Sequence, residues 1–177
     1  MRATTWCGFA VLALLGSLPA QADPSPLPDK TVAAGMKRAK CSVPLKDAVA
    51  DTDISFLTKP LKLLIVPCWR ATYNAGSIVF VFDPKKPRQA KLLRFESWDG
   101  KKFTLEYSLS NAGFDPEIQM LFTTHKGRGV GDCGNHAKWR WTGIKFEMRG
   151  YWVKPDCDGE PFDDEYGQDK WRVFPKR

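Results

Sequence analysis

Four of the five cysteines of this 177-residue chain, Cys41, Cys68, Cys133 and Cys157, constrain it more than any other feature, because Cys7 lies in an N-terminal segment that we expect to be removed. An even number of cysteines in a chain exported to an oxidising compartment predicts disulfides, and four cysteines allow three pairings. We favour Cys41 with Cys68 and Cys133 with Cys157, because pairs of neighbours suit a chain of short hairpins, while the crossed pairings stay open. Each bridge closes a loop of roughly 25 residues, which stabilises the fold by about 3 kcal/mol.

The N-terminus indicates that the chain is exported. Arg2 precedes an apolar run, "WCGFAVLALLGSLPA", and the small residues around Ala22 are typical of a cleavage site. We therefore expect a signal peptide over residues 1–22, cleaved near Ala22, and a periplasmic or secreted domain. The run is too short to span a bilayer, and no later segment is apolar for long enough to do so.

The remaining chain is long enough for one domain with its own core. Residues 23–30 are rich in proline and predict a linker. Residues 31–177 predict a single exported β-rich domain. A short helix is expected over 29–40, with Asp29 as a possible N-cap.

Most of the domain has strand patterns. Residues 61–69 and 77–83 are apolar on both faces, which favours central strands covered on both sides, and a turn follows at 83–87. Residues 101–109 alternate between apolar and polar, as in a half-buried antiparallel strand.

A hairpin is expected further on. Trp139 and Trp141 precede a turn at Thr142-Gly143, and Ile144 is expected to begin the apolar face of the second strand of the hairpin. Strands over 118–125 and 170–174 bring the total to about eight. The prediction is a mainly β fold, an antiparallel meander sheet or sandwich with a short N-terminal helix, stapled by disulfides.

Residues 124–136, "THKGRGVGDCGNH", concentrate groups that could carry chemistry. Alternating glycines beside Lys126 and Arg128 could form an anion-binding nest of backbone N–H groups, although the spacing matches no phosphate-binding fingerprint. Alternatively, both histidines could bind zinc together with Asp132 and Cys133, or Cys133 could be a nucleophile. Both of these hypotheses need a thiolate, which an oxidised cysteine lacks. We favour a rigid crossover with glycines at positive φ and Cys133 stapled to Cys157.

Two other segments have competing interpretations. Residues 156–165 are acidic, and Asp156, Asp158 and Glu160 could bind calcium, but a solvated loop is favoured because the full ligand pattern is absent. Trp139–Trp141 and Trp152 could stack on sugars or bases, but their apolar face favours the core. We predict no metal and no cofactor.

The chain contains none of the common hydrolase or metalloprotease motifs, so we expect a non-enzymatic protein. The formal net charge is +7, which favours an anionic partner. Because the basic residues are spread along the chain rather than massed in one block, nucleic acid is not expected as a partner.

Several segments occur in an order that resembles a known family. They are "VPCWRATYN" (66–74), "KGRGVGDCG" (126–134), "WRWTGIKFEM" (139–148) and "PDC" (155–157). The set is similar to the bacterial family of proteins of unknown function numbered 1176, mainly its C-terminal half. The resemblance implies an exported, disulfide-containing protein and no particular reaction.

The predicted function is binding of an envelope or extracellular partner. The exposed surface expected to do so comprises Lys126, Arg128 and Asp132 with Tyr73 and Asn74. One alternative is an inhibitor similar to those of C-type lysozymes, which would insert Lys126 or Arg128 into an acidic cleft. Another is an envelope hydrolase or metal-dependent enzyme.

Overall fold

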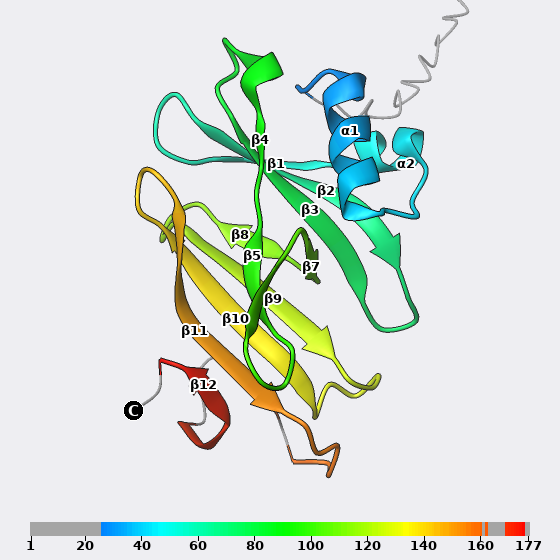
Figure 1. Cartoon of the computed structure of the whole chain (residues 1–177), viewed down its shortest axis with the longest axis vertical. Helices are drawn as coiled ribbons and strands as arrows, with labels where there is room; N and C mark the ends of the chain where they lie inside the picture. Colours follow the sequence, from blue (N-terminus) through cyan, green and yellow to red (C-terminus); the bar gives the residue numbers. More distant parts are fainter. Residues whose placement is uncertain (1–25, 161, 163–168, 176–177) are drawn as a thin grey trace, which may run out of the picture.

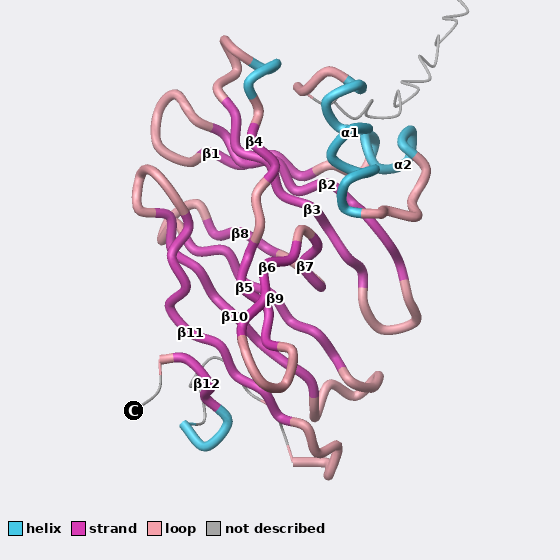
Figure 2. Tube along the Cα trace, in the orientation of Figure 1, coloured by secondary structure: helices cyan, strands magenta, loops and turns pink. Residues whose placement is uncertain are grey.

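Two five-stranded antiparallel sheets pack against each other, and two short helices cover the outer face of the first sheet (Figure 1). This computed structural model describes residues 26–160, 162 and 169–175. The predicted signal peptide over 1–22 lies outside the described residues. Figure 2 shows that strands are the main regular structure, as predicted. The two α-helices lie near the start of the described chain.

The first sheet is built around a long hairpin of two strands. Its members are β1 (Asp53–Phe56), β2 (Lys62–Arg70), β3 (Ala75–Phe82), β4 (Lys91–Leu92) and β7 (Ser108–Ser110). The order is β1-β2-β3, and β4 and β7 both pair with the remaining edge of β3. The edge of β3 is therefore shared by two short strands that are distant in sequence.

Strands β2 and β3 are buried on both faces, as the unbroken apolar pattern predicted. Leu63 and Ile65 pack between the two sheets. Leu64 and Val66, which point the other way, pack beneath the helices. A 3-10 helix, η1 (Pro87–Gln89), turns the chain from β3 into β4.

The helical layer contains α1 (Asp29–Ala39) and α2 (Leu45–Ala50). The prediction of Asp29 as N-cap is wrong, because Pro28 occupies that position and Asp29 lies in the first turn, where a carboxylate faces the positive end of the helix dipole. Helix α1 thus begins inside the predicted linker, and Leu27 of that segment is already buried. Helix α2 was not predicted, since its six residues are too few to show a helical period.

The second sheet is a meander. Its strands are β8 (Gly113–Asp115), β9 (Met120–Lys126), β10 (Gly134–Trp141), β11 (Phe146–Lys154) and β12 (Arg172–Phe174). Each strand pairs antiparallel with the next one along the chain, which confirms the antiparallel prediction. The 3-10 helix η2 (Asp169–Trp171) leads directly into β12.

A two-stranded ribbon, β5 (Phe95–Trp98) and β6 (Phe103–Glu106), is inserted between β4 and β7. The prediction of a single strand over 101–109 is therefore wrong in part, because the strand is interrupted at Tyr107, where the chain passes from the ribbon to the first sheet. Leu105, which was expected on the apolar face, is 51% exposed. The placement of Ile144 on the core face is also wrong, because Ile144 lies in the β10–β11 turn and is 88% exposed.

The structure pairs Cys41 with Cys68 and Cys133 with Cys157, across sequence separations of 27 and 24 residues. The first bridge joins the end of α1 to β2, and the carbonyl of Cys68 accepts hydrogen bonds from the N–H groups of Ser42 and Val43. The second joins the β9–β10 loop to the segment after β11. Among the described residues, no helix combines the length and the apolar character needed to cross a membrane.

Candidate functional site

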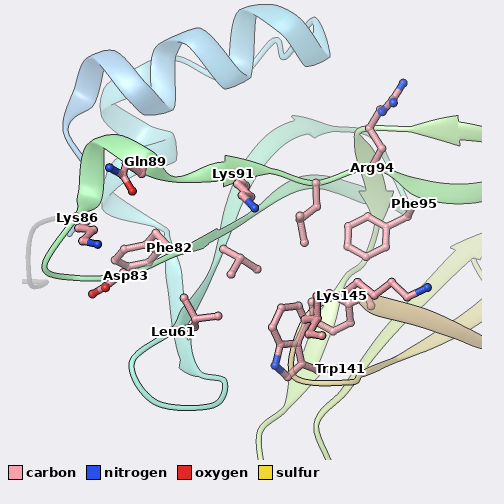
Figure 3. A pocket seen from close by; sticks show the side chains of 14 residues that line it. Leu61, Phe82, Asp83, Lys86, Gln89, Lys91, Arg94, Phe95, Trp141 and Lys145 are labelled. Carbon is pink, nitrogen blue, oxygen red and sulfur yellow. The ribbon is translucent and has the colours of Figure 1, made fainter.

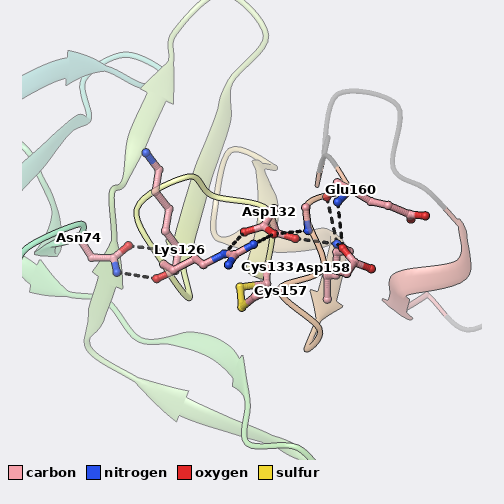
Figure 4. Close-up of a disulfide and its surroundings, with 10 residues drawn as sticks. Asn74, Lys126, Asp132, Cys133, Cys157, Asp158 and Glu160 are labelled. Carbon is pink, nitrogen blue, oxygen red and sulfur yellow. Dashed lines mark hydrogen bonds and ion pairs between the residues drawn. A yellow bond between two sulfur atoms is a disulfide. The ribbon is translucent and has the colours of Figure 1, made fainter.

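The structure brings the five predicted site residues into one region. The turn between β2 and β3 lies beside the glycine loop, a name used here for residues 126–134 (Figure 4). The Asn74 side chain donates to the Lys126 carbonyl at 2.9 Å and accepts from the Lys126 N–H at 2.8 Å. Asn111 Nδ2 donates to Asn74 Oδ1 at 2.9 Å, which fixes the amide in this orientation. Asn74 is thus a brace for the glycine loop rather than a free binding group.

The glycines of the loop are required for two different reasons. Gly131 has φ +74° and Gly134 has φ +132°, so they meet the prediction of positive φ. Gly127 and Gly129 are needed instead for close packing. A Cβ on Gly127 would lie 2.8 Å from Cys133 Sγ, and one on Gly129 would lie 2.9 Å from the Tyr73 ring.

Asp132 holds the loop from within. Its carboxylate accepts hydrogen bonds from Arg128 Nε at 2.7 Å and from Arg128 Nη2, so the guanidinium and the carboxylate form a bidentate ion pair. The Gly159 N–H donates to the same carboxylate at 2.6 Å. The Arg128 hydrogen bonds, together with that N–H, hold the pKa of Asp132 well below its usual range. The pairing also raises the pKa of Arg128.

Lys154, at the end of β11, is a member of this network that was not predicted. Its side chain is 1% exposed, and its ammonium group donates to the carbonyls of Asp132 at 2.8 Å and Glu160 at 3.0 Å and to the Asp158 carboxylate. The Lys154 hydrogen bond lowers the pKa of Asp158. A lysine on the same strand face as Trp152, four residues before an aspartate, is the signal that could have revealed it.

These contacts leave little room for an anion nest. The N–H of Gly127 donates to the Cys133 carbonyl at 2.9 Å, and the N–H of Gly131 donates to the Arg128 carbonyl at 3.0 Å. The backbone N–H groups of two of the three alternating glycines therefore donate to carbonyls within the loop, and Arg128 is already paired with Asp132. A phosphate would have to displace these bonds to be held here.

The proposed zinc ligands are engaged elsewhere. Cys133 is in a disulfide, His125 Nδ1 lies 3.1 Å from Ser110 Oγ, and His136 Nδ1 lies 3.0 Å from Thr124 Oγ1. Within the described ranges, one group of three potential ligands converges, Asp132 with the two bridged cysteines, which offer no thiolate. The candidate calcium ligands are also used separately, because Asp158 binds Lys154 and the Glu160 carboxylate pairs with Lys170 at 3.1 Å.

The Arg128 side chain is 47% exposed but paired with Asp132, and three other side chains of this braced surface have no ion-pair or side-chain hydrogen-bond partner among the described residues. Val130 is 78% exposed at the loop tip, and Tyr73 is 53% exposed while its ring rests against Gly129. The alkyl stem of Lys126 lies over Gly131, and no carboxylate of the described residues pairs with its ammonium group. Figure 4 shows this group pointing away from the Asp132 network. We call Tyr73, Lys126 and Val130 the tip surface.

The structure also places a serine beside a histidine, which the sequence did not indicate. Ser110 of β7 and His125 of β9 line a polar cavity of about 240 Å³ together with Glu96 and Asn135. The two residues are 15 positions apart and meet only because β7 borders β9. Among the described residues, no carboxylate hydrogen-bonds to His125, so the pair lacks the third group that orients a catalytic histidine.

Comparisons with known proteins identify a family and a relative of this chain. The family described as "Protein of unknown function (DUF1176)" matches residues 17–173. The uncharacterized protein YpfG of Escherichia coli (strain K12) is 32% identical over 138 residues, which are 77% of this chain and 38% of that protein. No solved structure matches the chain. The chain therefore belongs to the DUF1176 family.

Proposed function

We propose that this chain is an exported, non-enzymatic binding domain, and that its tip surface docks in an acidic cleft of an envelope protein. The observation that carries this proposal is the exposure of Val130 on a loop that several cross-links hold rigid. Isolated exposed apolar residues are common on flexible loops, but rigid presentation lowers the entropy cost of binding.

The chemistry of the tip surface favours an acidic partner. Tyrosine is enriched among the residues that dominate interfaces, and Tyr73 is held in place by Gly129 with half of its surface free. Lys126 supplies a positive charge that no described carboxylate neutralises, and the chain as a whole carries +7. Arg128 contributes less than expected, because Asp132 already compensates its charge.

Binding rather than catalysis is supported by the direction of the pKa shifts. Among the described residues, the pKa is shifted for Asp99, Arg128, Asp132 and Asp158. Each of these shifts stabilises the charged form of the group. A general acid or base needs a pKa moved towards the working pH instead. These residues are therefore suited to holding structure.

A photo-crosslinking amino acid at position 130 tests the docking proposal in cells that export the chain. We expect one discrete protein adduct, and we expect Lys126→Glu in the same chain to abolish it by reversing the attraction. A crosslinker at Leu105, which is 51% exposed on the separate β5–β6 ribbon, is the matched control. The same adduct from both positions, or an adduct insensitive to Lys126→Glu, would overturn the proposal.

A lysozyme-inhibitor function is a second candidate, favoured by the outward ammonium group of Lys126. The cleft of a C-type lysozyme carries two catalytic carboxylates that would attract a cation. We expect a micromolar excess of the protein to slow a C-type lysozyme and the Lys126→Glu variant to leave its muramidase rate unchanged. Full muramidase activity in the presence of the unmodified protein would exclude the lysozyme-inhibitor function. The docking proposal would then still be tested by the crosslinking experiment.

The hydrolase alternative is tested at Ser110. A fluorophosphonate probe labels serines that a neighbouring base activates. We expect no labelling of the folded protein, because His125 lacks an orienting carboxylate among the described residues. Labelling that disappears in Ser110→Ala and in His125→Ala would replace the binding proposal with an enzymatic one.

A further inference from the structure

A cavity of about 390 Å³ lies at the opposite end of β10 from the glycine loop (Figure 3). It opens between the β3–β4 edge of the first sheet and the β10–β11 turn of the second. Gly134 begins β10 beside the glycine loop, whereas Trp141 ends β10 in the wall of this cavity. The cavity and the tip surface are therefore separate, and neither proposal depends on the other.

The floor and walls of the cavity are apolar. They include Leu61, Val81, Leu93, Phe95, Trp141 and Phe146. Trp141 Nε1 already donates to Thr58 Oγ1 at 3.2 Å, so the indole offers the cavity only its apolar surface. The Trp141 and Phe146 rings pack together with centroids 5.1 Å apart, which fixes one wall. A lining of this kind favours a hydrocarbon or aromatic body.

The rim carries an excess of positive charge. Four cations, Lys86, Lys91, Arg94 and Lys145, line the cavity with a single acid, Asp83. The Asp83 carboxylate accepts the N–H of Lys85 at 2.8 Å and thus belongs to the local turn. An apolar chamber with a cationic rim is complementary to a molecule that has an apolar body and one anionic end.

Two of these cations are available to such a molecule. Figure 3 shows the Lys91 ammonium group turned into the cavity and the Arg94 guanidinium turned away from it. Lys145 pairs with Glu147 at 3.4 Å, and Arg94 lies over the Tyr107 ring at 5.8 Å. Lys86 and Lys91 have no carboxylate partner among the described residues. Their positions mark the place for an anionic head.

We infer that this cavity binds an anionic amphiphile, a molecule with one acyl chain and a carboxylate or phosphate head. The chain would lie against Trp141 and Phe95, and the head would meet Lys86 and Lys91 at the rim. Both a free fatty acid and a lysophospholipid share this chemistry. Exposed Ile144 stands at the mouth, where it would contact the part of the chain nearest solvent.

Calorimetry with fatty acids of increasing length, kept below micelle-forming concentrations, tests the apolar part. We expect one molecule to bind per protein and each added CH₂ to tighten binding about fourfold until the chamber is filled, after which affinity stops rising. Binding that keeps strengthening with length, or that appears only on anionic phosphatidylglycerol vesicles, would indicate surface adsorption and overturn the inference.

Substitution of the rim tests the anionic part. The double variant Lys86→Gln/Lys91→Gln should bind decanoate at least tenfold more weakly and keep its affinity for 1-decanol, which has no charge. The matched control is Lys101→Gln/Lys102→Gln, which removes the same charge from the β5–β6 turn, outside the cavity lining. Equal loss of decanoate binding in both double variants would contradict the assignment.

A comparison of ligands that differ in their head group shows whether the natural ligand is a fatty acid or a lysophospholipid. Lysophosphatidylglycerol binding tighter than a fatty acid of the same chain length identifies a lysophospholipid, and the reverse order identifies a free fatty acid. Lysophosphatidylcholine, which carries an additional positive charge, should bind at least tenfold more weakly than lysophosphatidylglycerol. Equal affinity for these two lysophospholipids would show that the rim does not select an anion.

Discussion

The two disulfides close loops of similar length but belong to regions of opposite character. Cys41–Cys68 joins α1 to the first sheet, where the surrounding contacts are apolar and include Val32, Val66 and Phe80. Cys133–Cys157 lies at the end of the second sheet, where ion pairs of Asp132 and Lys154 surround it.

The difference shows how one kind of cross-link serves two purposes. In the first region the bridge adds to a layer that burial of apolar surface already stabilises. In the second region the loop has few apolar contacts, so its shape depends on the bridge, on charged hydrogen bonds and on glycine. Val130 is left exposed on a loop built this way, and the surface that we propose for docking lies here.

The largest expected effect comes from breaking the apolar region. Phe80 is 2% exposed beneath α1, and Phe80→Ala should lower the free energy of unfolding by about 4 kcal/mol by leaving a cavity. Phe56, which is 68% exposed on β1, is the control, and Phe56→Ala should change it by less than about 1 kcal/mol. Urea denaturation measures both. Similar losses for the two variants would refute the layered core.

Removing each disulfide should destabilise the chain by a similar amount but in different places. Cys41→Ala/Cys68→Ala and Cys133→Ala/Cys157→Ala should each cost about 3 kcal/mol, because the closed loops are similar in length. Hydrogen exchange separates them: the second variant should expose the amides of Gly127 and Gly131, and the first those of Ser42 and Val43. Identical exchange patterns in the two variants would remove the distinction between the regions.

The polar region should be the one that responds to acid. Because the folded-state pKa of Asp132 lies below the ordinary 3.8, its pairing stabilises the fold fully above about pH 5 and is lost as the pH falls through the folded-state pKa. Asp132→Asn should therefore be less stable than the unmodified chain at pH 7 and approach it at low pH. Denaturation curves from pH 7 to 2 give the comparison.

Asp51→Asn provides the control for that experiment, since it breaks the ion pair with Arg70 in which both side chains are more than half exposed. We expect its stability curve to run close to that of the unmodified chain at every pH. If Asp51→Asn and Asp132→Asn respond to pH alike, the special role of the Asp132 network would be disproved.

The smallest expected effect concerns the glycines. Gly131 has φ +74°, so Gly131→Ala should lower the free energy of unfolding by about 1 kcal/mol. Gly113 on β8 has open space where a Cβ would lie, and Gly113→Ala should stay within about 0.5 kcal/mol of the unmodified chain. Thermal unfolding resolves this difference, and an equal shift for both would show that backbone conformation does not limit the loop.

Parts of the fold could be predicted because local patterns decide them. Burial on both faces of β2 and β3 follows from their unbroken apolar sequence, and the Trp139–Trp141 hairpin follows from alternation before a turn. Helix α2 and strand β4 were missed because six and two residues carry too little periodicity. The break at Tyr107 was missed because the alternation continues across it, and only the pairing of β7 with β3 shows where the strand changes sheet.

The candidate site divides in the same way. The glycine loop and Tyr73-Asn74 could be singled out from their composition, and the structure places them side by side. Their individual roles could not be predicted, because whether Arg128 is offered to solvent or paired depends on where Asp132 lies in space. Lys154 was missed because lysine is ordinarily exposed, and its position two residues after Trp152 and four before Asp158 is a weak local sign of burial.

The sequence by itself determined the mainly β character, the doubly covered hairpin and the glycine-rich loop, because strand propensity and glycine's conformational freedom act between residues close along the chain. Only the tertiary structure decided which cations stay free. Lys126 lies over glycine and faces solvent, Arg128 meets Asp132, and Lys86 and Lys91 collect at a cavity formed by two sheets. The charge of a lysine or arginine is written in the sequence, but its availability depends on neighbours that only folding brings near.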